Sequence, residues 1–189
     1  MPNWCENDLT ITGPKISELL KFIQSVDPKE KSPLDFNKII PYPKEFAVKD
    51  AKANEFREKM QSIVGEGPEF EAKRKALRSQ YGVKEGQFFM TDGYNQGGYE
   101  WCNVNWGTKW NACEARIEQQ SETSVMITFN TAWSPPLQVL DKLAVLYPSN
   151  TFKLACFECG AGYKGNIVWK MGKMVKKEFY HQYRGRRGG

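Results

Sequence analysis

The sequence predicts a single α+β domain with a ferredoxin-like β-α-β-β-α-β antiparallel sheet, a helical insertion and a C-terminal hairpin. Three observations predict it. Alternating apolar and polar residues, the pattern of half-buried strands, recur near the N-terminus and through the second half of the chain. Apolar residues at helical spacing follow the first and third of these segments. A long block rich in Lys, Glu and Ala separates the two halves, and its removal leaves the split β-α-β order of ferredoxin-like folds.

The composition is that of an ordinary globular protein. The chain has 189 residues, of which 40% are hydrophobic and 26% charged, so it can bury a core without disulfides or metal. It has no run of about 18 apolar residues, and its first residues lack the basic and then apolar pattern of a secretory signal. The five cysteines are scattered and odd in number, which favours free thiols. We therefore expect a cytoplasmic protein with no membrane partner.

The order of the elements follows from alternation, helical spacing and the positions of glycine and proline. Cys113, Ala115 and Ile117 alternate with charged residues, so they predict a half-buried strand. Right-handed crossovers place both helices of the basic fold on one sheet face and leave the other face free for the insertion, a partner or a ligand. The expected strands are residues 7–12, 113–117, 125–129, 152–157, 166–170 and 173–177, and the expected helices are residues 15–26 and the segment opened by Pro135-Pro136.

The insertion and the segments around it are less regular. Residues 36–46 are expected to be extended, because their two prolines exclude a helix interior. The helical insertion spans about residues 48–85, and Gly65–Pro68 divides it into two helices. A loop rich in glycine and aromatic residues covers 82–100, and loops of this length are mostly functional or mobile.

The basic residues are concentrated at the C-terminus. The formal net charge is +5, yet from Lys170 onward there are seven Lys or Arg and one acid, so the rest of the chain is close to neutral. We predict that the domain ends at residue 180 and that residues 181–189 form a basic, flexible tail. Such a tail attracts polyanions, which leaves nucleic acid open as a partner.

Several segments resemble the YubB-like family. They are Met-Pro-Asn-Trp-Cys-Glu-Asn at the start, Asn105-Trp-Gly-Thr-Lys-Trp-Asn-Ala112, Phe129-Asn-Thr-Ala-Trp-Ser-Pro-Pro136, and Phe157-Glu158 followed by Tyr163-Lys-Gly165. The resemblance covers most of the chain and is weakest over residues 48–95. It implies a ferredoxin-like domain and an origin on plasmids, phages or genomic islands of bacteria. It does not imply a settled activity.

The main candidate for a working surface is the segment Trp101–Trp110. Three tryptophans lie within ten residues, with Lys109 beside the last of them. Aromatic faces can stack on a base, and a lysine can meet a phosphate. Gly107 would let a ligand or another chain approach the backbone. The alternative is that the tryptophans only cover the sheet core. The candidate ligand-binding residues of this segment are Trp101, Asn105, Trp106, Thr108, Lys109 and Trp110.

Two further positions join the candidate ligand-binding site. Trp133 and Ser134 lie at a strand-to-helix junction, where Ser134 fits the N-cap and Pro135 the first helical position. That helix N-terminus could bind an anion with Trp133 stacked nearby. In the alternation of its strand, Glu158 falls at a position where the other residues are apolar, yet it carries a charge. It could pair with Lys109, act as an acid-base group or form a simple salt bridge.

The sequence offers little catalytic chemistry. His181 is the single histidine, which excludes a histidine-based triad or a two-histidine metal site, and no phosphate-binding loop motif is present. Cys156 and Cys159 have zinc or redox spacing but lack a second close pair, so Cys156 is expected to be a small core residue. No metal, cofactor or catalytic residue is predicted. Carboxylates that could converge in a metal-dependent site are Asp92, Glu100, Glu114 and Glu158.

These observations rank three functions. The first is a non-enzymatic binding protein from a phage or mobile element, which holds a nucleotide-like small molecule or a host defence protein through its aromatic and basic surface and so inhibits host defence. The second is a nucleic-acid-binding module, since aromatic residues on such sheets stack bases. The third is a hydrolase or nuclease that uses carboxylates and a divalent metal. Oligomerisation through sheet edges or Phe88-Phe89-Met90 stays open.

Overall fold

The computed structural model describes residues 3–26, 31–84 and 86–189. Its contacts divide the chain into two compact units. One comprises the residues up to Pro41 together with Glu100–Gly189, and the other comprises Tyr42–Tyr99. The second unit corresponds to the insertion that we expected at about 48–85 with its following loop, although residue 85 lies outside the described residues.

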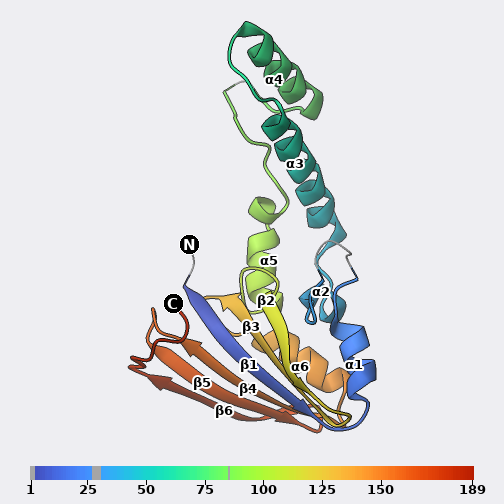
Figure 1. Ribbon diagram of the computed structural model, residues 1–189, viewed down its shortest axis with the longest axis vertical. Helices are drawn as coiled ribbons and strands as arrows, with labels where there is room; N and C mark the ends of the chain where they lie inside the picture. Colours follow the sequence, from blue (N-terminus) through green and yellow to red (C-terminus); the bar gives the residue numbers. More distant parts are fainter. Residues whose placement is uncertain (1–2, 27–30, 85) are drawn as a thin grey trace. The chain divides into compact units, whose positions relative to one another are not determined.

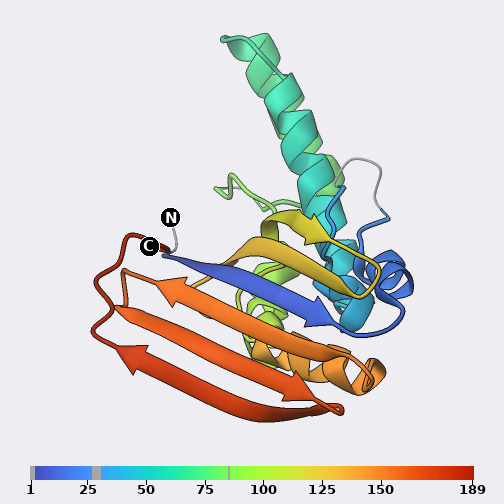
Figure 2. The same ribbon diagram turned by 60° about the horizontal axis from the view of Figure 1, so that its bottom comes forward.

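The first unit is built on one antiparallel sheet of six strands in the order β2-β3-β1-β4-β5-β6 (Figures 1 and 2). Without β5 and β6, the order is that of the predicted β-α-β-β-α-β unit, with β1 at its centre between β3 and β4. The last two strands form the predicted C-terminal hairpin. The strands are β1 (Trp4–Thr12), β2 (Cys113–Gln120), β3 (Ser124–Ala132), β4 (Thr151–Glu158), β5 (Tyr163–Lys170) and β6 (Lys173–His181).

Helices cover one face of this sheet. Figure 2 shows α1 (Ile16–Ile23) and α6 (Leu137–Leu146) on the same side, as right-handed crossovers require. Each helix buries an apolar stripe with 3–4-residue spacing against the sheet. The buried residues are Ile16, Leu19, Leu20 and Ile23 in α1, and Val139, Leu140, Leu143 and Ala144 in α6.

Successive side chains of a strand point to opposite faces of the sheet. We call the face that α1 and α6 pack against the covered face and the other the open face. Along β1, Cys5, Asn7, Leu9 and Ile11 are buried, whereas the residues between them are partly exposed on the other side. The edge strand β2 departs from the expectation of a half-buried strand, because Ile117 is 40% exposed. Two register irregularities against β3 interrupt the alternation of β2, which is typical of an edge strand.

The prediction that residues 36–46 are extended was wrong. The short helix α2 (Phe36–Ile39) lies there, and α3 begins at Lys44. The Asp35 side chain accepts a hydrogen bond from the Asn37 N–H at 2.9 Å and so caps α2. Proline is compatible with a helix start, and Pro43 stands immediately before α3 rather than inside it.

The second unit consists of α3 (Lys44–Ser62), α4 (Pro68–Tyr81) and a 3₁₀ turn, η1 (Tyr94–Gln96). The predicted break between two helices at Gly65–Pro68 is present. Arg74 ties the two helices together, since its guanidinium donates to the carbonyls of Ile63 and Gly65 at 3.1 and 2.9 Å. In this unit Phe88 and Phe89 are more than two-thirds exposed beside a hollow lined by Phe56 and Met60.

Among the described residues, no helix has both the length and the apolar character that crossing a membrane demands.

Candidate ligand-binding site around Trp133

The segment Trp101–Trp110 is not one surface. Its first half belongs to α5 (Gly98–Asn105), and the rest forms a turn before β2. Trp106 is only 3% exposed, and its indole Nε1 donates to the Ile40 carbonyl at 2.9 Å. Its ring packs edge-on against Phe36 and Trp101, with centroids 5.9 and 5.5 Å apart. Trp106 is therefore a core residue, and its assignment to a ligand-binding surface was wrong.

Two other polar candidates of this segment also serve the fold. Thr108 is fully buried, and its hydroxyl donates to the Ala132 carbonyl at 2.9 Å. The Asn105 side-chain amide donates to the Trp101 carbonyl one helical turn earlier, at 2.9 Å. Both side chains thus bond main-chain carbonyls of the protein. The prediction that Thr108 contacts a ligand is wrong, because no part of it reaches the surface.

Gly107 permits a close approach, but of the protein itself. Its φ of +80° favours glycine, and a Cβ there would lie 2.1 Å from Oε1 of Gln138. The Gly107 carbonyl accepts a hydrogen bond from the Ser134 hydroxyl at 2.6 Å. The glycine therefore lets the turn after α5 pack against the segment that leads into α6.

Ser134 does not cap α6 as predicted. The helix begins at Leu137, with Pro136 at the N-cap position, so Pro135 is not the first helical residue. The hydroxyl of Ser134 donates to Gly107 instead, which leaves it no role at the helix N-terminus. The two consecutive prolines delay the helix, because the residue before a proline is disfavoured in helical conformation.

Trp133 is the exposed aromatic residue of this region. Half of its surface is accessible, and its backbone has a φ of +71°, which is unusual for a bulky residue. Two hydrogen bonds hold it there: its N–H donates to the Asn3 carbonyl at 2.9 Å, and its carbonyl accepts from the Tyr163 hydroxyl at 2.7 Å. The backbone is thus fixed while the indole points outward.

Lys109 lies against this indole. Its Nζ is 3.3 Å from the centroid of the Trp133 ring and 5.9 Å from that of Trp110, so both contacts are within cation–π range. Trp110 in turn meets Trp4 edge-on, with centroids 6.3 Å apart. The structure therefore brings together three of the predicted residues, Trp133, Lys109 and Trp110.

A shallow hollow of about 380 Å³ adjoins Trp133. Its chemistry is mixed: aromatic rings from β5 and β6, the cationic Lys177, and polar groups from α5 and α6. Sequence reasoning missed this wall and placed His181 in the flexible tail, whereas it ends β6. The sequence signal that could have located this wall is the alternation of side chains, which continues from the predicted strand through Lys177, Phe179 and His181. The lining residues are Asn103, Gly107, Trp133, Ser134, Pro135, Leu137, Gln138, Tyr163, Lys177, Phe179 and His181.

Glu158 is buried and caps a turn. Its Oε1 accepts from the Gly160 N–H at 2.9 Å, and its Oε2 accepts from the Ala161 N–H. The carboxylate thus serves the turn, while an ion pair with Lys109 and an acid-base role stay untested predictions. Glu158 therefore shapes the β4–β5 turn that carries Tyr163 to the edge of the hollow.

Beneath this turn two thiols meet. The Cys5 thiol lies on the covered face with the Cys156 thiol beside it, and the Tyr163 hydroxyl oxygen lies 3.6 Å from the Cys5 sulfur. The hydrogen bond with Cys156 lowers the pKa of Cys5, whereas that bond and burial raise the pKa of Cys156. Cys156 is thus the predicted core residue, and Cys159 separately contacts the Gly188 carbonyl.

The candidate metal-binding carboxylates are not brought together. Glu114 bonds the Asn130 side chain on the open face, while Glu158 lies on the covered face. Asp92 accepts from the Asn95 backbone within the second unit. Within residues 3–26, 31–84 and 86–189, no group of three or more His, Cys, Asp or Glu side chains could hold a metal ion.

Comparison with known proteins supports the fold. No curated protein is significantly similar to this chain. The crystal structure of a protein api92 from Yersinia pseudotuberculosis is similar, with a TM-score of 0.55 and 11% identity, over 95% of this chain and 98% of that one. The family model described as the ferredoxin-like domain in Api92-like protein matches residues 105–184, from the end of α5 to just beyond β6. The fold is therefore ferredoxin-like, and over these residues the chain is similar to Api92-like proteins.

Proposed function

We propose that this is a non-enzymatic binding protein that holds a nucleotide-like small molecule in the hollow beside Trp133. The observation that carries the proposal is the exposed indole of Trp133, held at a positive φ by hydrogen bonds from both sides. A bulky residue in this conformation costs on the order of 1–3 kcal/mol, and such strain gathers at ligand-binding positions.

The charges around the indole match the proposed ligand. Lys109 lies over one part of the Trp133 ring, and Lys177 lines the hollow beside it. An aromatic base stacked on Trp133 would place its phosphates within reach of these ammonium groups. Gln138 at the rim adds an amide that can both donate and accept hydrogen bonds. The arrangement offers stacking, charge and hydrogen bonding to such a ligand.

Calorimetric titration with ATP, GTP and their cyclic monophosphates tests the proposal. The unaltered protein should bind at least one of them. Trp133→Ala should weaken that binding by about tenfold or more, because base stacking contributes roughly 1–3 kcal/mol. Trp133→Phe should retain most of it. Lys177→Ala should also weaken it, whereas Lys176→Ala should not, since Lys176 pairs with Glu178 on the open face.

Strand β6, which carries Lys177, also offers a matched aromatic control. Tyr180 is 47% exposed but faces away from the hollow, so Tyr180→Ala should leave the affinity unchanged. The proposal is wrong if none of these nucleotides binds, or if Trp133→Ala binds as tightly as the unaltered protein. Binding of a single-stranded oligonucleotide with a steep salt dependence, weakened by Lys176→Ala, would instead favour a nucleic-acid-binding module.

The wider role we propose is inhibition of a host defence by a protein of a phage or other mobile element. Its support is the resemblance to the YubB-like family, whose members occur on plasmids, phages and genomic islands. A protein that sequesters a nucleotide signal needs a binding surface, and the aromatic and cationic lining of the hollow supports this role. A host defence protein that docks on the same exposed indole is the alternative ligand, and it would compete with nucleotides for Trp133.

A further inference from the structure

The last residues of the chain lie on the open face of the sheet. The Tyr183 N–H donates to the Gly162 carbonyl at 2.8 Å, which turns the chain back after β6. The Gly189 N–H donates to the Trp4 carbonyl at 2.7 Å, and the Gly188 N–H donates to Glu6 at 2.8 Å. We had predicted a flexible tail at 181–189, and that prediction did not foresee these contacts with β1.

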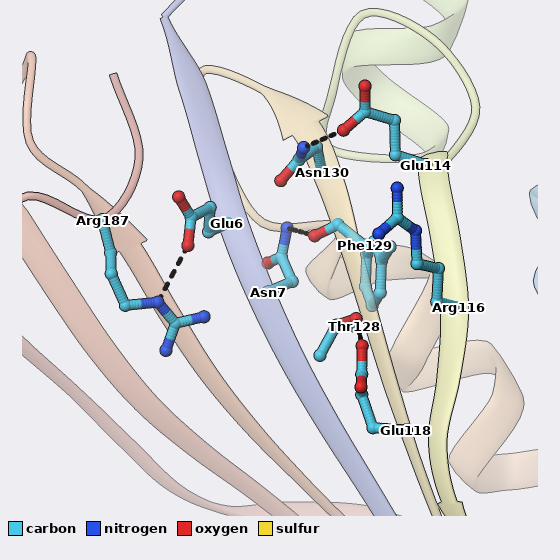
Figure 3. A pocket seen from close by; sticks show the side chains of 9 residues that line it. All are labelled: Glu6, Asn7, Glu114, Arg116, Glu118, Thr128, Phe129, Asn130 and Arg187. Atoms are coloured by element: carbon cyan, nitrogen blue, oxygen red, sulfur yellow. Dashed lines mark hydrogen bonds and ion pairs between the residues drawn. The ribbon is translucent and has the colours of Figure 1, made fainter.

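Arg187 is the anchor of this tail. Its Nη1 and Nη2 donate to the two oxygens of Asp8, each at 2.7 Å. Its Nε donates to Glu6 at 2.8 Å (Figure 3). The guanidinium carbon also lies 4.1 Å from the centroid of the Phe157 ring. These contacts raise the pKa of Arg187, with the hydrogen bond to Asp8 as the main cause. Two carboxylates and an aromatic floor form a built site for a guanidinium.

The surface next to this site stays open and carries further acids. A hollow of about 180 Å³ separates Arg187 and Glu6 from the side chains of β2 and β3. Figure 3 shows Glu114 and Glu118 on its far side, bonded to Asn130 and Thr128. Three of the lining residues are acidic and two, Arg116 and Arg187, are basic, so the hollow becomes strongly acidic once the tail leaves.

We propose that the open sheet face is a binding site for an arginine-bearing peptide segment of a partner protein, and that the chain's own tail occupies it as a tethered stand-in. The partner segment inserts its guanidinium between Glu6 and Asp8 over Phe157, in the place of Arg187. This site is separate from the hollow at Trp133, because Glu6, Asp8 and Phe157 lie on the open face and Phe179 and Lys177 on the covered face.

The chemistry favours arginine over lysine. Asp8 receives two parallel N–H bonds, and only a guanidinium supplies this fork. A flat guanidinium also stacks on a phenyl ring, whereas an ammonium is a compact, strongly hydrated charge. Arg187 is held by its side chain and the two following glycines by main-chain donors, so a segment of the type Arg-Gly-Gly reproduces these contacts with Glu6, Asp8 and Trp4.

The test uses the full chain and a fluorescent peptide of residues 183–189 with blocked ends. Fluorescence anisotropy measures its binding to the unaltered protein and to Arg187→Ala, in which the tail has lost its anchor. Arg187→Ala should bind the peptide at least about tenfold tighter than the unaltered protein, because the peptide no longer competes with a tethered arginine. Arg186→Ala is the matched control and should behave as the unaltered protein, since Arg186 is exposed.

Two further arms locate the site. In the Arg187→Ala background, Asp8→Asn should reduce peptide binding by about tenfold or more. Phe157→Leu should also weaken peptide binding. It is the alternative variant if Asp8→Asn lowers the stability of the protein. A peptide with lysine in place of Arg187 should bind more weakly than the parent. The proposal is overturned if Arg187→Ala binds the peptide no tighter than the unaltered protein, or if neither Asp8→Asn nor Phe157→Leu weakens binding.

Discussion

At the scale of single residues, Trp106 and Trp133 have opposite roles. Trp106 is enclosed by Phe36, Trp101 and the Ile40 carbonyl, whereas Trp133 is half exposed with Lys109 against its ring. Sequence alone could not separate them, because both are aromatic residues beside glycine, serine or proline. What separates them is the tertiary hydrogen-bond partner of each, which lies far away in the chain.

This difference predicts effects of different size on the free energy of unfolding. Trp106→Ala should lower the free energy of unfolding by about 3–5 kcal/mol, since it removes a large buried ring and leaves a cavity. Trp133→Ala should change it by about 1 kcal/mol or less, because the ring is half in solvent. Urea denaturation followed by circular dichroism measures both. Equal losses for the two variants would contradict the assignment of Trp133 to the surface.

At the scale of elements, the junction between α2 and the segment before β2 depends on one asparagine. The Asn111 side chain accepts from the Phe36 N–H at 2.8 Å and donates to Asp35 at 2.7 Å. Asp35 is at the same time the cap of α2. The prediction of extended structure at 36–46 failed for this reason: a four-residue helix is set by a distant partner and not by its own propensities.

Removing that partner should loosen α2. We expect Asn111→Ala to destabilise the protein by about 1–3 kcal/mol, because the buried Phe36 N–H and the cap of α2 lose their bonds. In Asn111→Ala, amide hydrogen exchange should speed up more at Phe36 and its neighbours than in the strands of the sheet. Asn130→Ala, which removes an exposed bond to Glu114, is the control and should cost less than about 1 kcal/mol. Similar losses of stability in both variants would contradict the conclusion that Asn111 holds α2 in place.

At the scale of the whole first unit, the sheet order was predictable and the site was only partly so. Alternation in segments such as Leu9-Thr10-Ile11 and Val125–Phe129 identifies strands directly, since a covered sheet face demands it. The wall formed by Lys177, Phe179 and His181 extends the same alternation, but the predicted strand ended at Lys177 and His181 was assigned to the tail. The docking of Arg187 on Asp8 and Glu6 was beyond reach, because it pairs residues from opposite ends of the chain.

The two faces of the sheet therefore carry two separate proposals. The covered-face edge presents Trp133, Lys177 and a shallow hollow suited to a stacked, negatively charged ligand. The open face presents a guanidinium site that the tail fills. Because no proposed contact is shared, variants of Arg187 should leave nucleotide binding at Trp133 intact, and each claim can fail without the other.

The most direct test of the account is a two-dimensional NMR spectrum of the six tryptophan indole N–H groups during titration with the nucleotide that calorimetry identifies. We expect the Trp133 resonance to shift progressively to saturation, while those of the buried Trp106 and Trp169 stay in place. Assignment follows from the loss of one signal in Trp133→Phe. A spectrum in which no indole signal moves, or in which signals move in Trp133→Ala as they do in the unaltered protein, would contradict it.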